Sequence, residues 1–248
     1  MSVPSPVIVE LRRSLRAIEG EGRRRPALPF ALPALDTRLA DGGLRLDALH
    51  EVASQGAGWG DDAAAVLFAA GVVARTNGPV LWVVRTRDLF APGLYQAGLD
   101  PARVLYAEAR DDGELLALME DGLRHGGLGA VLGEPRRVEM AQSRRLQLAA
   151  EQSGTPAFLL RQPRSGRDPL DVPSAAATRW RVGHAPSLPV PWGGLGPACW
   201  QVQCVRQRGG DPFELVVEGS DETGCLALPA ALVDRPAAPA RAPQRAAA

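Results

Sequence analysis

The stretch Leu46-Asp47-Ala48-Leu49-His50-Glu51-Val52-Ala53, followed by the loop Ser54-Gln55-Gly56-Ala57-Gly58-Trp59-Gly60, decides the fold. The first part predicts a buried strand. An apolar helix pattern over residues 61–76 follows the loop and ends at Asn77-Gly78, a good stop signal. The next run, Val80-Leu81-Trp82-Val83-Val84, is continuously apolar, which is typical of a parallel strand buried on both faces. Together these segments predict a βαβ unit and a parallel sheet.

The same alternation continues towards the C-terminus. Helix patterns at 88–97, 112–125 and 139–153 alternate with apolar runs at 104–107, 128–133 and 157–161. Beyond residue 163 the predicted strands (180–182, 200–206 and 213–218) are short and separated by Gly and Pro, and residues 206–212 fit a hairpin turn. We therefore predict an α/β fold whose mostly parallel central sheet is flanked by helices and carries antiparallel hairpin strands near the C-terminal edge.

The pattern divides the chain into three parts. Residues 1–25 are predicted to form an amphipathic helix and a linker, and residues 26–228 a core domain. Residues 229–248 are rich in Ala, Pro and Arg and are predicted to be a disordered tail. The apolar face of the first helix is a candidate surface for a partner, and it consists of Val7, Leu11, Leu15 and Ile18.

Composition excludes several classes of function. The chain has 248 residues with 28 basic and 28 acidic side chains, and every basic residue is Arg because the sequence contains no Lys. Schiff-base chemistry and the lysine of an ordinary phosphate-binding loop are therefore excluded. The zero formal charge also excludes a uniformly basic nucleic-acid coat, so any nucleic-acid binding requires a local patch.

Targeting and metal-binding patterns are also missing. The N-terminal residues do not resemble a signal peptide, and the longest apolar run, 63–74, is too short to span a membrane. Cys199, Cys204 and Cys225 fit no zinc or thioredoxin spacing, and the three His residues lie far apart. We expect a cytoplasmic protein without a membrane partner, a metal or another cofactor.

Three segments carry a resemblance to RecA-like recombinases. Leu35-Asp36-Thr37-Arg38-Leu39-Ala40-Asp41-Gly42-Gly43-Leu44, followed by His50-Glu51-Val52, resembles the start of the RecA-like core. Gln96-Ala97-Gly98-Leu99-Asp100-Pro101-Ala102-Arg103-Val104 is similar to the turn before a later strand, and Val205-Arg206-Gln207-Arg208 with Pro212-Phe213 resembles the late hairpin. With gaps, the resemblance covers residues 32–220 and implies a RecA-like core.

The loop departs from the family's phosphate-binding loop. Its glycines remain, but the lysine and the following Ser or Thr do not, and two acids stand at the start of the predicted helix. Acids there suit the helix dipole and repel phosphate; each unit charge is worth about 4 kcal/mol at about 4 Å and an effective dielectric near 20. We therefore expect a degenerate loop, formed by Ser54, Gly56, Gly58, Trp59, Gly60, Asp61 and Asp62.

Three further positions bear on nucleotide chemistry. The resemblance places Thr86 where RecA-like ATPases have a water-activating glutamate, and Glu134 where they have a metal-supporting aspartate. Glu134 is either a solvated acid at a strand end or a retained metal contact. Trp59 either plugs the empty site or forms an exposed anchor for a partner. These changes imply that the ATPase machinery is lost while the scaffold remains.

A scaffold of this kind with an N-terminal helix is similar to the ImuA family. Those accessory proteins are encoded beside ImuB, an inactive Y-family polymerase homologue, and an error-prone DnaE-type polymerase. The resemblance implies a role in SOS-induced translesion synthesis through contacts with ImuB and, indirectly, the DnaE-type polymerase; RecA and single-stranded DNA are further candidate partners. Two alternatives stay open, a SulA-like cell-division inhibitor that binds the tubulin-like division protein and an atypical RecA-like DNA-dependent ATPase.

Arginines supply the remaining candidate contacts. Two groups lie near the regions where RecA-like proteins place DNA-facing loops, and a third lies in the late hairpin, where the family's basic residues reach across a subunit interface. Such clusters neutralise phosphates or contact a partner, although a solvated face has the same pattern. The candidates are Arg136, Arg137, Arg144, Arg145, Arg161, Arg164, Arg167, Arg206 and Arg208.

Overall fold

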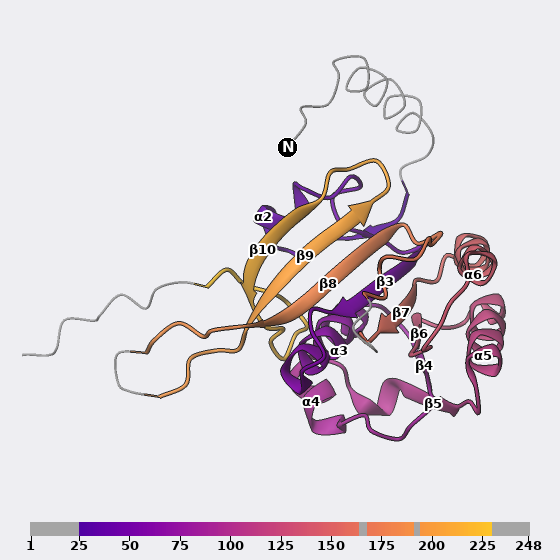
Figure 1. Ribbon diagram of the computed structural model, residues 1–248, viewed down its shortest axis with the longest axis horizontal. Coiled ribbons are helices and arrows are strands. Elements are labelled where there is room, and N and C mark those ends of the chain that lie inside the picture. Colours follow the sequence, from indigo (N-terminus) through magenta and orange to yellow (C-terminus); the bar gives the residue numbers. More distant parts are fainter. Residues whose placement is uncertain (1–24, 164–167, 191–193, 230–248) are drawn as a thin grey trace, which may run out of the picture.

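An eight-stranded sheet in the order β10-β9-β8-β3-β7-β6-β4-β5 forms the centre of the molecule in the computed structural model, which describes residues 25–163, 168–190 and 194–229 (Figure 1). Neighbouring strands from β8 to β5 are parallel, whereas β9 and β10 are antiparallel. The strands are β3 (Leu49–Ser54), β4 (Val80–Val84), β5 (Val104–Glu108), β6 (Ala130–Gly133), β7 (Ala157–Arg161), β8 (Thr178–Ala185), β9 (Cys199–Gln207) and β10 (Phe213–Glu218). The predicted fold class is confirmed.

Helices cover both faces of the parallel part of the sheet (Figure 1). α3 (Trp59–Ala74) packs against α4 (Ala91–Gln96), and α5 (Asp112–His125) packs against α6 (Met140–Ser153). Side chains alternate along each strand, so Trp82 joins the core under α3 whereas its neighbour Val83 joins the core under α5 and α6. This two-sided burial explains why the strand is apolar throughout.

Most element boundaries agree with the sequence pattern. The predicted residues of β4, β7, α5 and β10 match the structure. α5 was readable because its first turn is capped by Asp111, which accepts a hydrogen bond from the Glu114 N–H (2.9 Å), and its end is marked by Gly126 at φ 70°. The predicted strand at 46–53 was wrong at its start, because residues 44–45 form a separate short strand and β3 begins at Leu49.

Short elements before β3 were not predicted. β1 (Ala27–Leu28) pairs with β2 (Leu44–Arg45), and α2 (Pro33–Asp36) lies between them in the chain. This segment delivers Phe30 into an aromatic cluster with Phe68 and Trp180, whose ring centroids lie 5.7–6.0 Å apart. The cluster attaches the N-terminal segment to α3 and β8.

The segment after β10 returns to α3. A Cβ atom placed on Gly98 would lie 2.5 Å from the backbone nitrogen of Gly224, and Gly98 itself has φ +86°. A Cβ on Gly71, in the last turn of α3, would collide with Ser220. Glycines at these two positions therefore allow residues 220–224 to lie directly on the core.

Several predicted features lie outside the described residues. They are the N-terminal partner helix with Val7, Leu11, Leu15 and Ile18, the tail from residue 230 onwards, and Arg164 and Arg167. Within the described part of the chain, no helix combines the length and apolar character needed to cross a membrane.

Candidate functional site

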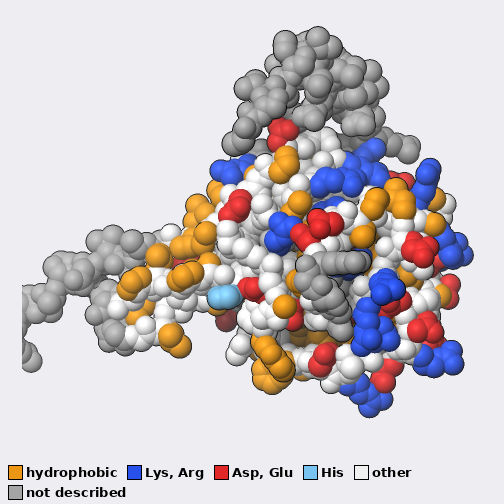
Figure 2. Space-filling view, viewed as in Figure 1, with side chains coloured by type: hydrophobic (Ala, Val, Ile, Leu, Met, Phe, Trp, Pro, Cys, Tyr) orange, Lys and Arg blue, Asp and Glu red, His pale blue; other side chains and the backbone are white. Residues whose placement is uncertain are grey.

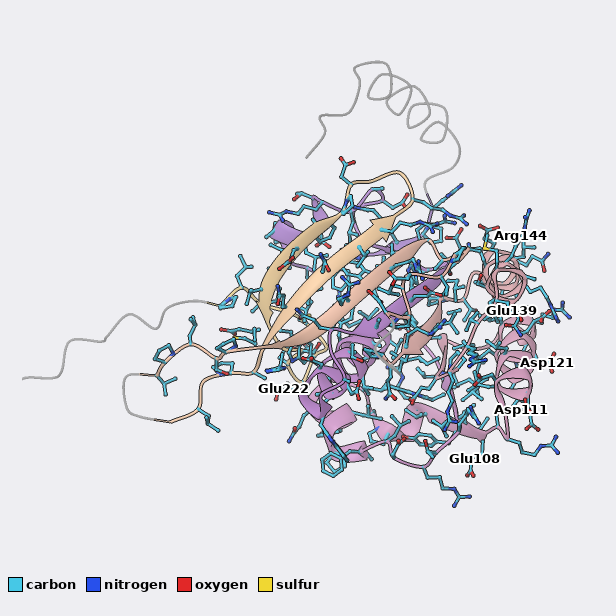
Figure 3. The ribbon with its side chains drawn as sticks, in the orientation of Figure 1. Glu108, Asp111, Asp121, Glu139, Arg144 and Glu222 are labelled. Atoms are coloured by element: carbon cyan, nitrogen blue, oxygen red, sulfur yellow. The ribbon has the colours of Figure 1, made fainter. Side chains whose placement is uncertain are left out.

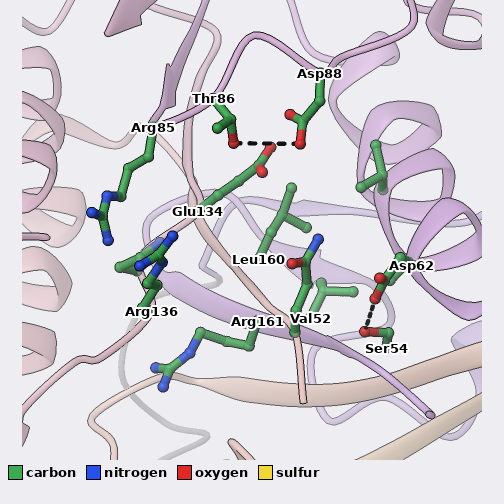
Figure 4. Close-up of a pocket in the computed structure, with 14 residues that line it drawn as sticks. Val52, Ser54, Asp62, Arg85, Thr86, Asp88, Glu134, Arg136, Leu160 and Arg161 are labelled. Carbon is green, nitrogen blue, oxygen red and sulfur yellow. Dashed lines mark hydrogen bonds between the residues drawn. The ribbon is translucent and has the colours of Figure 1, made fainter. Parts of the chain in front are cut away.

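A cavity lies where the chain changes direction at the carboxyl edge of the sheet. From β4 the chain crosses through α4 to β5, and from the adjacent β6 it crosses through α6 to β7 on the opposite side. In open α/β sheets, ligands bind in the crevice formed at such a point. Here a cavity of about 50 Å³ is lined by residues from β3, the ends of β4, β6 and β7, and the start of α3 (Figure 4).

The carboxylate of Asp61 lies inside the glycine loop beside this cavity. A Cβ atom on Gly56 would lie only 2.7 Å from Asp61 Oδ2. Asp61 Oδ1 accepts hydrogen bonds from the backbone N–H of His184 (2.9 Å) and contacts its Nδ1 at 2.6 Å. An acid of the chain itself therefore lies against Gly56 of the glycine loop and is tied to the end of β8.

The neighbouring residues of the glycine loop lie on the same side of the cavity as Asp62. Ser54 is buried, and its Oγ donates a hydrogen bond to Asp62 Oδ1 (2.5 Å). Gly58 is the N-cap of α3 and supplies no side-chain cap, and Gly60 lies under the His184 ring. Trp59 is 94% exposed, so it does not plug the site, and its role as an anchor for a partner stays a prediction.

Glu134 is a largely buried acid that lines the cavity just after β6. Its Oε1 accepts a hydrogen bond from Trp82 Nε1 (2.8 Å). Burial, the largest cause, and the negative charges of Asp88 and Asp62 together raise the pKa of Glu134 to about 7, although the hydrogen bond from Trp82 lowers it. The reading as a solvated acid is therefore wrong. Thr86, at the position of the family's water-activating glutamate, has a hydroxyl in place of a carboxylate. This hydroxyl donates a hydrogen bond to Asp88 Oδ2 (3.4 Å).

The described ranges contain no group of three or more His, Cys, Asp or Glu side chains that could hold a metal ion. The reading of Glu134 as a retained metal contact, made beside a bound nucleotide, stays a prediction.

Three arginines form the opposite wall. Arg85 follows β4, Arg136 follows β6 and Arg161 ends β7, and their guanidinium groups gather on one side of the cavity (Figure 4). One carboxylate positions two of them, because Asp112 Oδ1 accepts a hydrogen bond from Arg85 Nη1 (3.1 Å) and another from the backbone N–H of Arg136 (3.0 Å). The cavity therefore has a cationic wall and an acidic wall.

Arg161 belongs to a buried group with excess positive charge. Its Nη1 lies 3.8 Å from Glu51 Oε1, while Arg179 Nε donates to Glu51 Oε2 at 2.6 Å. All three side chains are at least 93% buried. Burial is the main reason that the pKa of Arg161 is lowered, and one carboxylate faces two guanidinium groups.

The other predicted arginines lie elsewhere. Arg144 points outward from α6 (Figure 3), and Arg145 pairs with Glu120 of α5 (2.5 Å). Arg206 and Arg208 donate to backbone carbonyl oxygens of the segment 174–176. Arg137 is exposed, with its backbone N–H bonded to Asp112. On the face shown in Figure 2, basic side chains over the α5–α6 side are interspersed with acidic ones.

Comparison with known proteins gives a clear relative. No protein-family model matches the chain. The protein named ImuA from Caulobacter vibrioides strain NA1000 / CB15N is 39% identical over 208 residues, which cover 79% of this chain and 84% of that protein. The ImuA protein of strain ATCC 19089 / CIP 103742 / CB 15 matches equally well. The chain belongs to the ImuA family.

A solved structure agrees on the fold of this ImuA-family chain. The RadB recombinase superimposes with a TM-score of 0.57 at 16% identity, covering 81% of the present chain and 98% of RadB. At this identity the likeness concerns the fold alone, and it identifies the core as RecA-like.

Sequence reasoning missed two residues that shape the site. Arg85 and Asp112 hold the cationic wall of this ImuA-family protein together, yet the sequence pattern singled out neither residue. Its position as the first residue of α5 was the available signal. The pairing itself could not be read without the order of the strands.

Proposed function

We propose that this chain is a non-catalytic, RecA-like accessory factor for SOS-induced error-prone translesion DNA synthesis. It acts through contacts with an ImuB-type inactive Y-family polymerase and, through that protein, with a DnaE-type polymerase. Membership of the ImuA family and the RecA-like fold support the accessory role.

The position of Asp61 carries the non-catalytic part of the proposal. A nucleotide bound in the usual pose requires backbone amides and a cation around its phosphates. Here the Asp61 carboxylate lies against Gly56. The chain also contains no Lys that could supply the cation next to the phosphates. A phosphate at that position would meet like charge at close range, which argues against tight ATP binding.

Isothermal titration with ATP and Mg²⁺ tests the loop. We expect no binding in the micromolar range and no hydrolysis above the buffer rate. Micromolar ATP binding, or hydrolysis that is abolished by Asp62→Ala, would contradict the proposal and favour the atypical ATPase.

A pull-down with purified ImuB tests the partner. We expect the full chain to capture ImuB, and deletion of residues 1–25 or 229–248 to reduce the capture. Unchanged capture by both deletions would move the interface to the core. No capture by the full chain, combined with binding to the tubulin-like division protein, would favour the SulA-like alternative.

A further inference from the structure

The cationic wall of the crevice contains a buried donor without an acceptor. Arg161 has only 5% of its side chain exposed, and its Nη1 makes no hydrogen bond. The Glu51 oxygen at 3.8 Å is too distant to serve as a hydrogen-bond acceptor. Leaving a buried charged donor unpaired is costly, so native structures normally supply an acceptor.

Arg85 and Arg136 converge on the same space. Arg85 is anchored through Nη1 to Asp112, whereas its buried Nε has no hydrogen-bond partner. Arg136 lines the cavity at its exposed rim, with its backbone fixed by the same carboxylate. Arg85 directly follows β4, Arg136 lies three residues beyond β6 and Arg161 ends β7, so three neighbouring segments bring the guanidinium groups together (Figure 4).

The cavity suits one small oxyanion. Its volume of about 50 Å³ corresponds to a few water molecules, which is also roughly the space needed by one tetrahedral anion. Guanidinium groups bind phosphate oxygens through paired, charge-assisted hydrogen bonds. The position at the carboxyl ends of parallel strands is where such sheets bind ligands.

The acidic side chains lie across the cavity from the arginines. Asp62 accepts a hydrogen bond from the Ser54 hydroxyl and Asp88 from the Thr86 hydroxyl (Figure 4). Glu134 uses Oε1 to accept from Trp82, which leaves its second oxygen for a proton. Because burial raises the pKa of Glu134 to about 7, the protonated form is populated near neutrality and can donate to an anion.

We propose that the crevice between β4 and β6 binds a phosphate-type oxyanion through Arg85, Arg136 and Arg161, with Glu134 as an additional donor. The crevice shares Ser54 and Asp62 with the glycine loop, but its arginines come from the segments at β4, β6 and β7. Anion binding there depends on neither the ImuB contact nor the absence of ATPase activity. The anion comes either from free inorganic phosphate or from the backbone of a single-stranded DNA.

Nuclear magnetic resonance on the full chain tests the site with inorganic phosphate as the probe. The indole N–H of Trp82 bonds to Glu134 and is a local reporter. We expect a saturable shift of this signal, and an affinity about ten-fold weaker in Arg136→Ala, the loss typical of a hydrogen bond to a charged group. The control Arg144→Ala, exposed on α6 outside the cavity, should bind like the wild type. An unmoved Trp82 signal, or equal weakening in both variants, would overturn the proposal.

Competition identifies the source of the anion. An oligothymidylate that displaces phosphate and moves the same Trp82 signal identifies the DNA backbone as the ligand. An oligothymidylate that leaves the phosphate titration unchanged identifies the free anion. Both results require that phosphate binds in the crevice. Neither experiment involves ImuB or ATP, so a failure to bind phosphate is distinguishable from a failure of the proposed function.

Sulfate, which stays doubly charged between pH 6 and pH 8, tests the role of Glu134. Raising the pH through about 7 ionises Glu134 and should weaken sulfate binding, whereas Glu134→Gln should bind equally at both ends of the range. The charged groups that face Glu134 across the cavity are Arg85 and Asp88 after β4, Asp62 of α3, Arg136 after β6, and Arg161 of β7. The same pH dependence in Glu134→Gln would exclude Glu134 as a donor.

Discussion

His50 illustrates how a single polar residue is fixed in the core. Its Nε2 lies 2.8 Å from the carbonyl oxygen of Arg45, which can only accept, so Nε2 carries the proton. Its Nδ1 therefore accepts from the hydroxyl of Thr178 (2.7 Å), and that oxygen accepts in turn from Trp180 Nε1 (2.6 Å). A neutral imidazole satisfies every bond in this network, and burial, the largest cause, lowers the pKa of His50 to about 4.

This network predicts a loss of stability in acid. The folded pKa of His50 is lower than the value of 6.5 in the unfolded chain, so its contribution is complete above pH 6.5 and is lost as the pH falls towards 4. The shift corresponds to about 3 kcal/mol of unfolding free energy. Urea denaturation of the wild type and His50→Gln should show a difference that shrinks by about this amount between pH 7 and pH 4; a constant difference would contradict the network.

Glu134 should change the free energy of unfolding with pH in the direction opposite to His50. Its folded pKa is raised, so the stability linked to its protonated form is complete below its ordinary value of 4.5 and is lost as the pH rises through about 7. Glu134→Gln keeps an acceptor for Trp82 and removes the charge. We expect the variant to gain on the order of 3 kcal/mol relative to the wild type above pH 7 and nothing at pH 4. Because His50 and Glu134 oppose each other, each must be measured as a difference from the wild type.

At the scale of elements, glycines report where segments touch. Gly98 has φ +86° and the backbone nitrogen of Gly224 lies 2.5 Å from where its Cβ would be, whereas Gly126 has φ +70° and open space around it. Both Gly98→Ala and Gly126→Ala introduce backbone strain of about 1–2 kcal/mol. Only Gly98→Ala must also displace the chain after β10, so we expect it to cost at least about 1 kcal/mol more than Gly126→Ala in urea unfolding. Equal costs would mean that the contact with Gly224 is weak.

Elements with a clear periodic pattern, a cap or a continuous apolar run could be predicted from the sequence. Period and caps defined α5, and continuous apolar character defined β4. β1, β2 and α2 have at most four residues each, too few to form a periodic pattern, and they are stabilised by non-local contacts such as the β1–β2 pairing and the packing of Phe30. The order of the strands is not encoded in local periodicity. The sequence therefore pointed to the glycine loop but not to the meeting of Arg85, Arg136 and Arg161.

At the scale of the whole molecule, thiol reactivity reports the integrity of the fold. Cys199 and Cys204 are buried, and burial raises the pKa of Cys204 to about 12, whereas Cys225 is partly exposed. Because thiolate is the reactive form, we expect an aromatic disulfide reagent to label Cys225 in the native protein and the other two only after unfolding. Rapid native labelling of all three thiols would contradict the packing of β9.

The contact of residues 220–224 with α3 has a consequence for how the protein is made. Synthesis delivers α3 and the turn at Gly98 well before the strand β10 and the segment that lies on these glycines. A nascent chain that stops before residue 219 would leave the backbone around Gly71 and Gly98 uncovered. Completion of the core therefore waits until the segment after β10 has been translated, and premature termination before this segment should yield a product that cellular proteases degrade rather than a working fragment.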